Sequence, residues 1–303
     1  MSEYTLITGA TGFVGKNLIP YLNSKGLVTK ALSRAELAQA IGFENSDTII
    51  HLAGKAHDLK KTSSPEEYYQ VNYELTKKLY DAFLKSEAKK FIFISSVKAS
   101  ADIVDGILSE DDLPNPVTDY GKSKLKAEQY IQSQDLPAGK FYYILRPCMI
   151  HGPGNKGNLN LLYKFVQKGI PYPLAAFENK RSFLSVENLC FLIANLLKKD
   201  IPSGVYNVAD DQPLSTTTVV NVLARSMGKR PSLWKISKSV INKLARIGDL
   251  LRLPINTERL YKLTEDYVVS NTKIKQALRV TLPLSAEDGL VKTAKSFANS
   301  KKD

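Results

Sequence analysis

The sequence predicts an α/β protein in which a doubly wound parallel sheet is joined to a smaller lobe. In the first half of the 303-residue chain, short and almost continuously apolar segments alternate with longer segments whose apolar residues have helical spacing. Apolar strands of this kind are typical of a parallel sheet that helices cover on both faces. A glycine-rich turn also joins the first strand to the first helix, as expected at the start of such a sheet.

The elements of the first half follow one another at short intervals. Strands are expected at 4–9, 28–33, 47–54, 89–97 and 141–147. Helices are expected at 13–26, 65–87 and 119–134. Since the strands lie in one parallel sheet, the helices between them should make right-handed crossovers. After Pro147 the chain becomes richer in glycine and loops, which indicates a separate, mixed lobe.

The turn after the first strand reads TGATGFVG, with its glycines three residues apart. Glycine is required where the chain turns tightly, where the backbone approaches a pyrophosphate and where the helix meets the strand. The N-terminus of the helix then presents free N–H groups to the phosphates. The motif predicts a dinucleotide-binding domain over 1–150. The residues expected to contact the cofactor here are Gly9, Thr11, Gly12, Phe13, Val14 and Gly15.

The remainder of the chain, 151–303, is expected to form a substrate-binding lobe. Its sequence should be interleaved with the first domain rather than fold separately. Helices and a strand from 182–210 are expected to return to the sheet. The fold class is therefore α/β, with a smaller C-terminal lobe.

The end of the second strand bears on the choice of cofactor. An acidic residue there binds the ribose 2′-hydroxyl of NAD, and a basic residue accommodates the 2′-phosphate of NADP. This chain has Ser33 and Arg34, and no carboxylate between the strand and Glu36. A hydroxyl and a guanidinium suit a phosphate better than a diol. NADP(H) is therefore favoured, and NAD(H) stays open.

The stretch TDYGKSK places one tyrosine near two lysines. If a helix begins near Tyr120, Lys124 lies one turn farther on the same face, whereas Lys122 is rotated by roughly 200°. A positive charge close to a phenol should lower the phenol pKa from about 10 towards neutrality. Such a tyrosine can act as a general base when ionised and as a general acid when protonated. Ser95 and Ser96, which end the preceding strand, offer a hydroxyl beside the reacting oxygen.

The motifs TGATGFVG, HLAG, FIFISSV, YGKSK and LRPCMIHGPG occur in the order seen in extended short-chain dehydrogenases/reductases. Over nearly its whole length the chain resembles the nucleotide-sugar epimerase/dehydratase family of that group. The resemblance implies a Rossmann fold with a C-terminal substrate lobe. It implies that Tyr120 is the catalytic acid/base, that Lys124 assists it and binds the cofactor ribose, and that Ser96 steadies the substrate oxygen. Ser95 is the alternative hydroxyl. The further cofactor contacts that it implies are Leu52, Ala53, Gly54 and Pro147.

The second half resembles segments with which the family binds a nucleotide diphosphate sugar. NKRSFLSVENL is similar to the segment whose arginine binds the substrate diphosphate, which implies that role for Arg181. GNKGNLNLL implies a contact from Asn158, and Arg259 is a second candidate for the phosphates. Arginines suit a diphosphate because a guanidinium binds two oxygens at once. The implied substrate is a UDP-N-acetylhexosamine, as used by bacterial enzymes of surface-polysaccharide sugar synthesis.

Two reactions at C4 of the sugar stay open. A 4-keto reductase delivers hydride once and works naturally with NADPH, whereas a 4-epimerase oxidises C4, lets the keto sugar rotate and returns the hydride. Arg34 favours the reductase, and the epimerase is the alternative. Dehydration is disfavoured because Val97 and Lys98, rather than acidic residues, follow the two serines. The third alternative is a non-catalytic protein that binds NADP(H) only as a sensor or scaffold. Such a protein needs the glycines but no acid/base residues, so the presence of Ser96, Tyr120 and Lys124 argues against it.

The net charge is +12, and seven basic residues with no acidic one lie between Arg225 and Arg246. This basic cluster lacks the interleaved aromatic residues of a single-strand binder, so nucleic acid is not an expected partner. Residues 233–251 have amphipathic helical spacing. We expect them to form a core-packed helix with a solvated face, and peripheral membrane association is the alternative.

Both cysteines, Cys148 and Cys190, lie inside apolar runs, which predicts reduced core thiols, a cytoplasmic protein and no clustered metal site. No segment approaches the roughly eighteen uninterrupted apolar residues that span a bilayer, and the N-terminus leaves no room for a signal peptide. The amphipathic helices at 65–87 and 119–134 could pair across a twofold axis in a homodimer.

Overall fold

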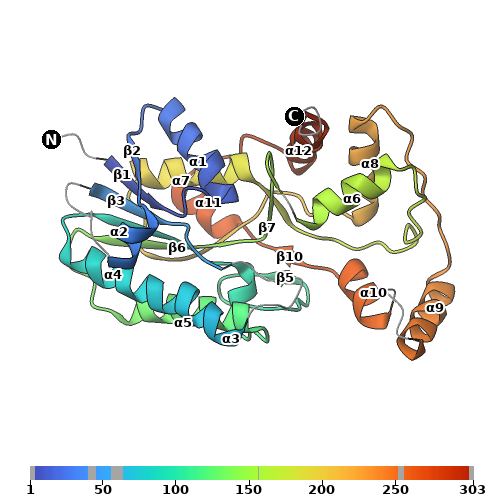
Figure 1. Ribbon diagram of the computed structural model, residues 1–303, viewed down its shortest axis with the longest axis horizontal. Helices are drawn as coiled ribbons and strands as arrows, with labels where there is room; N and C mark the ends of the chain where they lie inside the picture. The colour runs from blue at the N-terminus through green and yellow to red at the C-terminus, as the bar shows by residue number, and fades with distance from the viewer. Residues whose placement is uncertain (1–3, 40–45, 56–63, 156, 252–255, 300–303) are drawn as a thin grey trace.

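The computed structural model describes residues 4–39, 46–55, 64–155, 157–251 and 256–299. Its centre is a sheet of six parallel strands in the order β2-β1-β3-β4-β6-β9 (Figure 1). The strands are β1 (Tyr4–Thr8), β2 (Thr29–Ala31), β3 (Ser46–His51), β4 (Lys90–Ile94), β6 (Phe141–Pro147) and β9 (Gly204–Val208). The predicted parallel α/β fold is confirmed. β2 is shorter than expected because it forms the edge of the sheet, where Lys30 and Ala31 are exposed.

Helices cover both faces of this sheet (Figure 1). One face carries α1 (Phe13–Ser24), α7 (Val186–Lys198) and α11 (Thr272–Leu278), and the other carries α4 (Leu75–Lys85) and α5 (Asp119–Ser133). Consecutive strand residues alternate between these layers, so that Ile7 and Ile92 pack on the first face and Leu6 and Phe91 on the second. This burial on both sides explains why the strands are apolar throughout.

The helix expected at 65–87 is not uniform. α3 (Pro65–Tyr68) continues as a π-helical segment over Tyr69–Glu74 before α4 begins. π-helical turns are rare and occur frequently at functional sites. Here the segment contains the fully buried Asn72. A short 3₁₀ helix, Val97–Ala99, follows β4.

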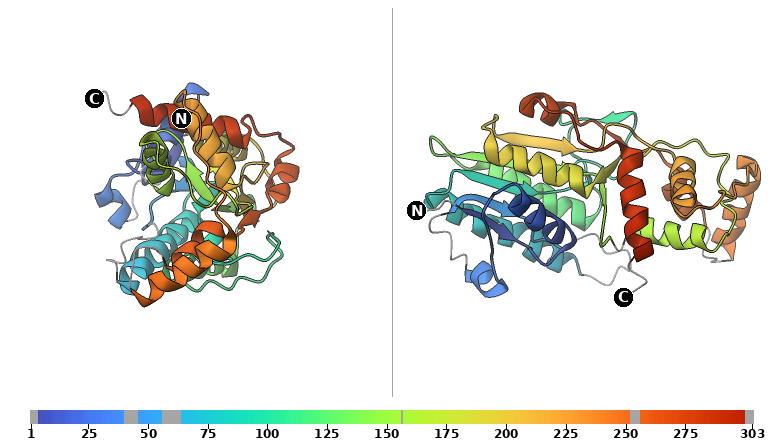
Figure 2. Two further views of the ribbon diagram at one scale, coloured as in Figure 1. Left: turned by 90° about the vertical axis from the view of Figure 1, so that its right-hand side faces the viewer. Right: turned by 90° about the horizontal axis from the view of Figure 1, so that it is seen from above.

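The second lobe has an apolar core of its own, built from α6 (Asn158–Gln167), α8 (Thr216–Ser226) and α12 (Ala286–Asn299). Beyond them, α9 (Lys238–Leu250) and α10 (Thr257–Thr264) form the end of the molecule that is farthest from the sheet (Figures 1 and 2). Two small parallel pairs complete the fold, β7 (Met149–His151) with β8 (Phe183–Ser185) and β5 (Ile107–Leu108) with β10 (Val268–Val269).

The chain passes between the two parts more than once. After α6, the segment 182–210 runs through β8 and α7 to β9, which pairs with β6 in the main sheet. The division into 1–150 and 151–303 stays a prediction. Within the described ranges, no helix combines the length and the apolar character needed to cross a bilayer.

The expectation for 233–251 was wrong in two respects. In α9 only Ile241, Ala245 and Gly248 are buried, as expected for a helix that packs on the core along one side. The exposed side, however, is not purely polar, because it also carries large apolar residues such as Leu244. The helix itself covers only Lys238–Leu250, because Leu233 and Lys235 instead form β-bridges with Tyr172 and Leu174, and only the packing around α9 shows which of its apolar residues are covered.

Candidate active site

The glycine turn between β1 and α1 has a backbone that few other residues could adopt. Gly9 has a φ of +67°, in the region that favours glycine. A Cβ on Gly9 would lie 2.7 Å from the Ala53 amide nitrogen, and one on Gly15 would lie 2.6 Å from the Ala10 carbonyl oxygen. The N-cap of α1 is Gly12, which has no side chain to bond the first N–H groups of the helix. A phosphate is a suitable partner for these groups.

The segment after β3 joins this turn to the catalytic residues. The Ala53 amide donates a hydrogen bond of 3.0 Å to the Thr8 hydroxyl. A Cβ on Gly54 would lie 3.0 Å from Lys124 Nζ and 3.0 Å from the Asn72 side-chain oxygen. The glycines of both segments pack closely against their neighbours without a side chain, and the N-terminus of α1 beside them has no side-chain cap. These features fit a nicotinamide dinucleotide.

At the end of β2, the Glu36 carboxylate lies beside Ser33, one of the two residues predicted to select the cofactor. Ser33 precedes α2 (Arg34–Gln39), and its amide donates a hydrogen bond of 2.8 Å to the Glu36 carboxylate. The Ser33 hydroxyl accepts a return bond of 3.2 Å from the Glu36 amide, which is a capping box. These bonds lower the pKa of Glu36, so the carboxylate is charged beside the expected ribose site. The side chain of Arg34 lies outside the described residues.

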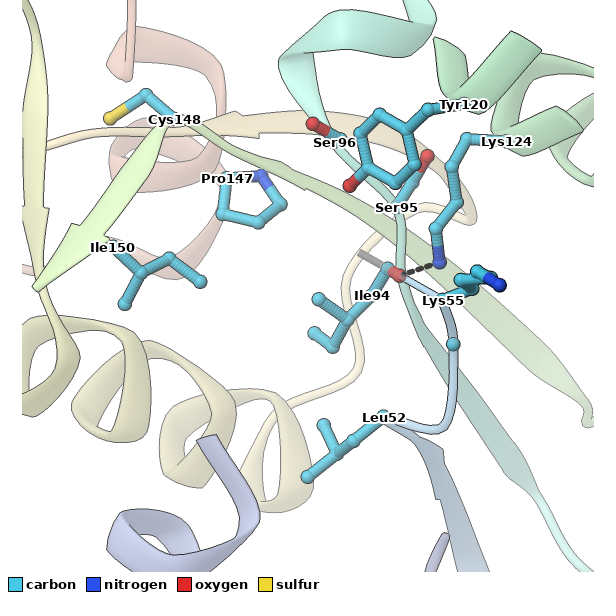
Figure 3. A pocket seen from close by; sticks show the side chains of 11 residues that line it. Leu52, Lys55, Ile94, Ser95, Ser96, Tyr120, Lys124, Pro147, Cys148 and Ile150 are labelled. Carbon is cyan, nitrogen blue, oxygen red and sulfur yellow. Dashed lines mark hydrogen bonds between the residues drawn. The ribbon is translucent and has the colours of Figure 1, made fainter. Parts of the chain in front are cut away.

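A pocket opens where the ends of β3, β4 and β6 meet α5 (Figure 3). This is the carboxyl edge of a parallel sheet, where ligands bind in open α/β folds. The pocket is lined by Leu52, Gly54, Lys55, Ile94, Ser95, Ser96, Tyr120, Lys124, Pro147, Cys148 and Ile150. The lining includes all three of the predicted catalytic residues, together with part of the predicted cofactor set.

Tyr120 lies in the first turn of α5, where the N-cap hydroxyl of Thr118 accepts a hydrogen bond of 3.2 Å from the Gly121 amide. Burial raises the pKa of the Tyr120 phenol, its hydrogen bond with the Ser96 side chain lowers it, and the phenol of Tyr68 raises it. The net shift is upward. The expected lowering of this pKa is therefore wrong, because loss of water around the phenol outweighs the effects that favour its ionised form.

Lys124 is almost fully buried, with 4% of its surface exposed. Its ammonium donates a hydrogen bond of 2.9 Å to the Ile94 carbonyl oxygen, drawn as a dashed line in Figure 3. Burial lowers the pKa of Lys124 to about 8, against the opposing influence of the Glu128 carboxylate. Lys122 is exposed. Helical spacing thus brings Lys124, and not Lys122, into the pocket with Tyr120.

The two serines after β4 have different partners. The Ser95 hydroxyl donates a hydrogen bond to the Glu128 carboxylate, which is fully buried. Glu128 also forms an ion pair with Arg146 at 2.6 Å between Oε2 and Nη2. Ser96 instead makes the side-chain hydrogen bond with Tyr120. Ser96 is therefore the hydroxyl that accompanies the phenol, and Ser95 belongs to a buried ionic network behind the pocket.

Sequence reasoning did not single out Lys55 and Asn72. The Asn72 side-chain oxygen accepts a hydrogen bond of 2.8 Å from the Lys55 amide, and its nitrogen donates one of 3.1 Å to the Ser123 hydroxyl. Lys55 lines the pocket, pairs with Glu67 and lies over the ring of Tyr68 at 5.7 Å from its centre. An asparagine inside an amphipathic helix is unfavourable by propensity, and that signal could have identified Asn72.

Of the residues predicted to bind the substrate, Ser95 lines this pocket, whereas Arg181 and Arg259 do not. The Arg181 guanidinium donates a hydrogen bond of 2.6 Å to the Lys262 carbonyl oxygen and lies 3.7 Å from the Glu265 carboxylate. Arg259 is exposed on α10. Asn158 begins α6, and its side chain lies outside the described residues. The structure thus brings the three predicted catalytic residues, Ser95 and part of the predicted cofactor set together in one pocket, and the roles of Arg181, Arg259 and Asn158 stay predictions.

Comparisons with known proteins agree with this arrangement. Residues 5–209 match the model of the NAD dependent epimerase/dehydratase family. The UDP-glucose 4-epimerase of Vibrio cholerae is 30% identical to this chain, over 98% of this chain and 96% of that protein. A solved structure, the UDP-N-acetylglucosamine 4-epimerase from Bacillus cereus, has a TM-score of 0.77 at 20% identity and covers 98% of this chain and 100% of its own, which shows a shared fold.

Two further relatives differ in the reaction that their names describe. The N-acetyl-alpha-D-glucosaminyl-diphospho-ditrans,octacis-undecaprenol 4-epimerase of Escherichia coli O157:H7 is 28% identical, over 100% of this chain and 98% of that protein. The GDP-6-deoxy-D-mannose reductase of Pseudomonas aeruginosa is 26% identical, over 74% of this chain and 80% of that protein. Both epimerases and a reductase are thus similar to this chain.

Proposed function

This chain belongs to the NAD dependent epimerase/dehydratase family, and from that premise we propose that it reduces the 4-keto group of a nucleotide sugar. A nicotinamide dinucleotide is the cofactor of the family. The proposal concerns the direction of the reaction and its substrate. Its direction rests on Ser33 and Arg34, which suit the 2′-phosphate of NADPH, the reductant that a reductase uses.

The raised pKa of Tyr120 suits the proton donation that the reductive direction needs. A phenol whose pKa is above its ordinary value stays protonated at neutral pH. Reduction of a ketone needs a proton donor at the carbonyl oxygen, whereas oxidation of an alcohol needs a base at the same place. The resting form of Tyr120 is therefore the form that a reductase requires.

Three residues of the pocket have separate roles in the proposed reduction. A reduced nicotinamide, when bound, supplies the hydride that forms the new C4–H bond. Ser96 holds the carbonyl oxygen by a hydrogen bond, and Tyr120 donates the proton that completes the hydroxyl group. Lys124, which is protonated below its pKa of about 8, stabilises the phenolate that remains.

We propose a UDP-N-acetylhexosamine in its 4-keto-6-deoxy form as the substrate. The resemblance of the NKRSFLSVENL and GNKGNLNLL segments to substrate-binding segments supports this choice. The names of the two 4-epimerase relatives support a hexosyl diphosphate, attached to a nucleoside in one case and to undecaprenol in the other. We propose that the diphosphate or the nucleoside is contacted by Arg181, Asn158 and Arg259. Ser95 lines the pocket and is proposed to form part of the wall around the sugar.

NADP(H) is the proposed cofactor, with NAD(H) as the alternative. Ser33 and Arg34 support NADP(H), since a hydroxyl and a guanidinium suit the 2′-phosphate. The Glu36 carboxylate, which accepts a hydrogen bond from the Ser33 amide, disfavours a 2′-phosphate and therefore supports NAD(H). Competition between the two cofactors is therefore part of the experiment below.

A UDP-sugar 4-epimerase is the second candidate. Two relatives that match the chain over nearly its whole length are named 4-epimerases, whereas the match to the reductase covers 74% of the chain. The same Tyr120, Ser96 and Lys124 would serve, but Tyr120 would act first as a base and then as an acid.

One experiment separates the two reactions. The purified protein is incubated with a UDP-4-keto-6-deoxy-N-acetylhexosamine and either NADPH or NADH, and separately with a UDP-N-acetylhexosamine and no added cofactor. We expect one equivalent of NADPH to be consumed for each keto sugar reduced, with slower use of NADH. Interconversion of C4 epimers without net consumption of cofactor would replace the reductase with the epimerase. The Tyr120→Phe variant is the control for chemistry at this site.

A further inference from the structure

The apolar residues left exposed on α9 form a continuous stripe. We define the α9 stripe as Val240, Leu244, Ile247 and Leu251, whose exposed fractions run from 47% to 61%. At ~100° per residue these four positions fall within an arc of roughly 60° along one side of the helix. A soluble domain seldom leaves such a stripe uncovered unless it meets a partner or a membrane.

The stripe is not part of the face that packs on the lobe. Ile241 and Ala245 belong to the apolar core of the lobe together with Leu260 of α10. By helical geometry they lie in the arc next to the stripe, so α9 has two adjacent apolar faces. One of these faces is covered by the lobe, and the stripe is the other.

Large side chains from the neighbouring segments are exposed as well. Trp234, before α9, is 55% exposed, and on α10 Tyr261 and Leu263 are 51% and 53% exposed. Leu250, at the end of α9, is 83% exposed. Tryptophan and tyrosine have amphipathic rings that favour the boundary between water and lipid.

Positive charge lies along one flank of the stripe. All seven basic residues between Arg225 and Arg246 are exposed. Lys243 and Arg246 lie on the flank of the stripe opposite Ile241, by the same helical geometry. The one acidic residue of α9, Asp249, accepts hydrogen bonds from the amide and the hydroxyl of Thr257.

The position of α9 in the fold leaves this surface accessible. α9 and α10 form the end of the molecule, on the far side of the second lobe from the sheet (Figures 1 and 2). The catalytic pocket lies at the sheet edge and includes no residue of either helix. Contact at α9 therefore need not block the site.

We propose that the α9 stripe and the basic residues around it dock the protein on an anionic membrane surface. An amphipathic helix with leucine and isoleucine on one side and lysine and arginine beside it can lie in the interface of an acidic bilayer. Lysine and arginine near such a surface add to the attraction, and added salt weakens it. This docking is independent of the direction of the proposed reaction.

A second copy of the chain fits the same surface less well. A twofold contact would bring the same patch of each copy together, so that Lys243 and Arg246 would face lysines and arginines of the partner copy. The like charges would repel, and among the described residues from Arg225 to Leu251 Asp249 is the single acidic residue that could relieve them.

The test is co-sedimentation of the full chain with lipid vesicles. Vesicles of phosphatidylglycerol and phosphatidylcholine are compared with vesicles of phosphatidylcholine alone. We expect binding to the anionic vesicles, at least tenfold weaker binding to the neutral ones, and release from the anionic ones at high salt. No substrate is present, so failure of this test is distinct from failure of the proposed reaction.

Variants separate the apolar from the electrostatic part. The Leu244→Gln/Ile247→Gln variant should lose at least tenfold in affinity for anionic vesicles at each salt concentration at which the wild-type chain binds. Lys243→Gln/Arg246→Gln should lose affinity mainly at low salt. The matched control is Leu113→Gln, since Leu113 is 92% exposed and lies outside the stripe. Thermal melting of each variant checks that it is folded.

Three outcomes would overturn the proposal. The first is absence of binding to anionic vesicles. The second is binding that Leu244→Gln/Ile247→Gln leaves unchanged. The third is a dimer of the wild-type chain that this variant converts to a monomer in analytical ultracentrifugation, which would assign the stripe to an interface between copies.

Discussion

α5 and α9 depart from the usual amphipathic helix in opposite ways. α5 buries charged side chains, since Lys124 is 4% exposed and Glu128 is fully buried. α9 exposes aliphatic side chains, with Leu244 at 53% and Ile247 at 49%. Each arrangement is unfavourable for stability or solubility when considered alone.

The two departures indicate different kinds of function. Buried charges persist where partners satisfy them, and in α5 these partners are the Ile94 carbonyl oxygen for Lys124 and Arg146 for Glu128. Polar groups held in this way are typical of a chemical site. The aliphatic side chains of the stripe stay about half exposed in the described part of the chain, so α9 indicates a surface for contact with another molecule or a membrane.

The largest effect is expected at Tyr120. Tyr120→Phe removes the proton donor and keeps the ring, so kcat should fall by about 10²- to 10⁴-fold. The dissociation constant for NADPH should change little, because the phenol oxygen lies at the reacting end of the site. Steady-state kinetics and fluorescence titration measure the two quantities. Unimpaired turnover would remove Tyr120 from the mechanism.

The ion pair of α5 offers the next test. Glu128→Ala leaves the Arg146 guanidinium buried without its partner, which should lower the free energy of unfolding by about 3–5 kcal/mol. Glu258→Ala breaks the exposed pair with Lys262 on α10 and should cost less than about 1 kcal/mol. Urea unfolding measures both. Similar losses for the two variants would contradict the contrast between buried and exposed charge.

The two serines should differ in their effect on turnover. Ser96→Ala removes the hydroxyl that bonds Tyr120, and kcat should fall by about 10²-fold. Ser95→Ala removes a bond to Glu128 instead, so kcat should fall less and the stability more. Equal losses of kcat would mean that both hydroxyls reach the substrate.

The pH dependence of the reduction follows from the raised pKa of Tyr120 and the lowered pKa of Lys124. Reduction needs Tyr120 and Lys124 in their protonated forms, and the pKa of Lys124 is about 8. The value of kcat/KM for the keto sugar should therefore be steady near neutrality and fall above pH 8. The fall should be about tenfold per pH unit where the loss of a single proton limits the rate. Lys122→Ala is the control and should leave the profile unchanged. A rate that rises with pH would contradict the acid role of Tyr120.

The smallest effect is expected on α9. Leu244→Gln/Ile247→Gln should change the free energy of unfolding by less than about 1 kcal/mol, because both side chains are already about half exposed. Urea unfolding measures this value beside the vesicle assay. A large loss of stability would show that the stripe packs on the protein itself.

Much of the fold could be predicted because its signals are local. The order of strands and helices follows from hydrophobic period, and the turn at Gly9 follows from the need for a positive φ. The same period placed Lys124 one turn from Tyr120. The π-helical stretch around Asn72 could not be predicted, since it depends on contacts with Lys55 and Ser123 from other segments.

The sequence by itself determined the parallel sheet, the glycine turn and the shared face of Tyr120 and Lys124, because each depends on residues close together in the chain. Only the tertiary structure decided three further points. It directed the Ser95 hydroxyl to the buried Glu128 carboxylate, raised rather than lowered the pKa of Tyr120, and left the α9 stripe exposed. All three depend on burial and on pairs such as Glu128 with Arg146, which are distant in sequence, and desolvation acts only once these segments have packed together.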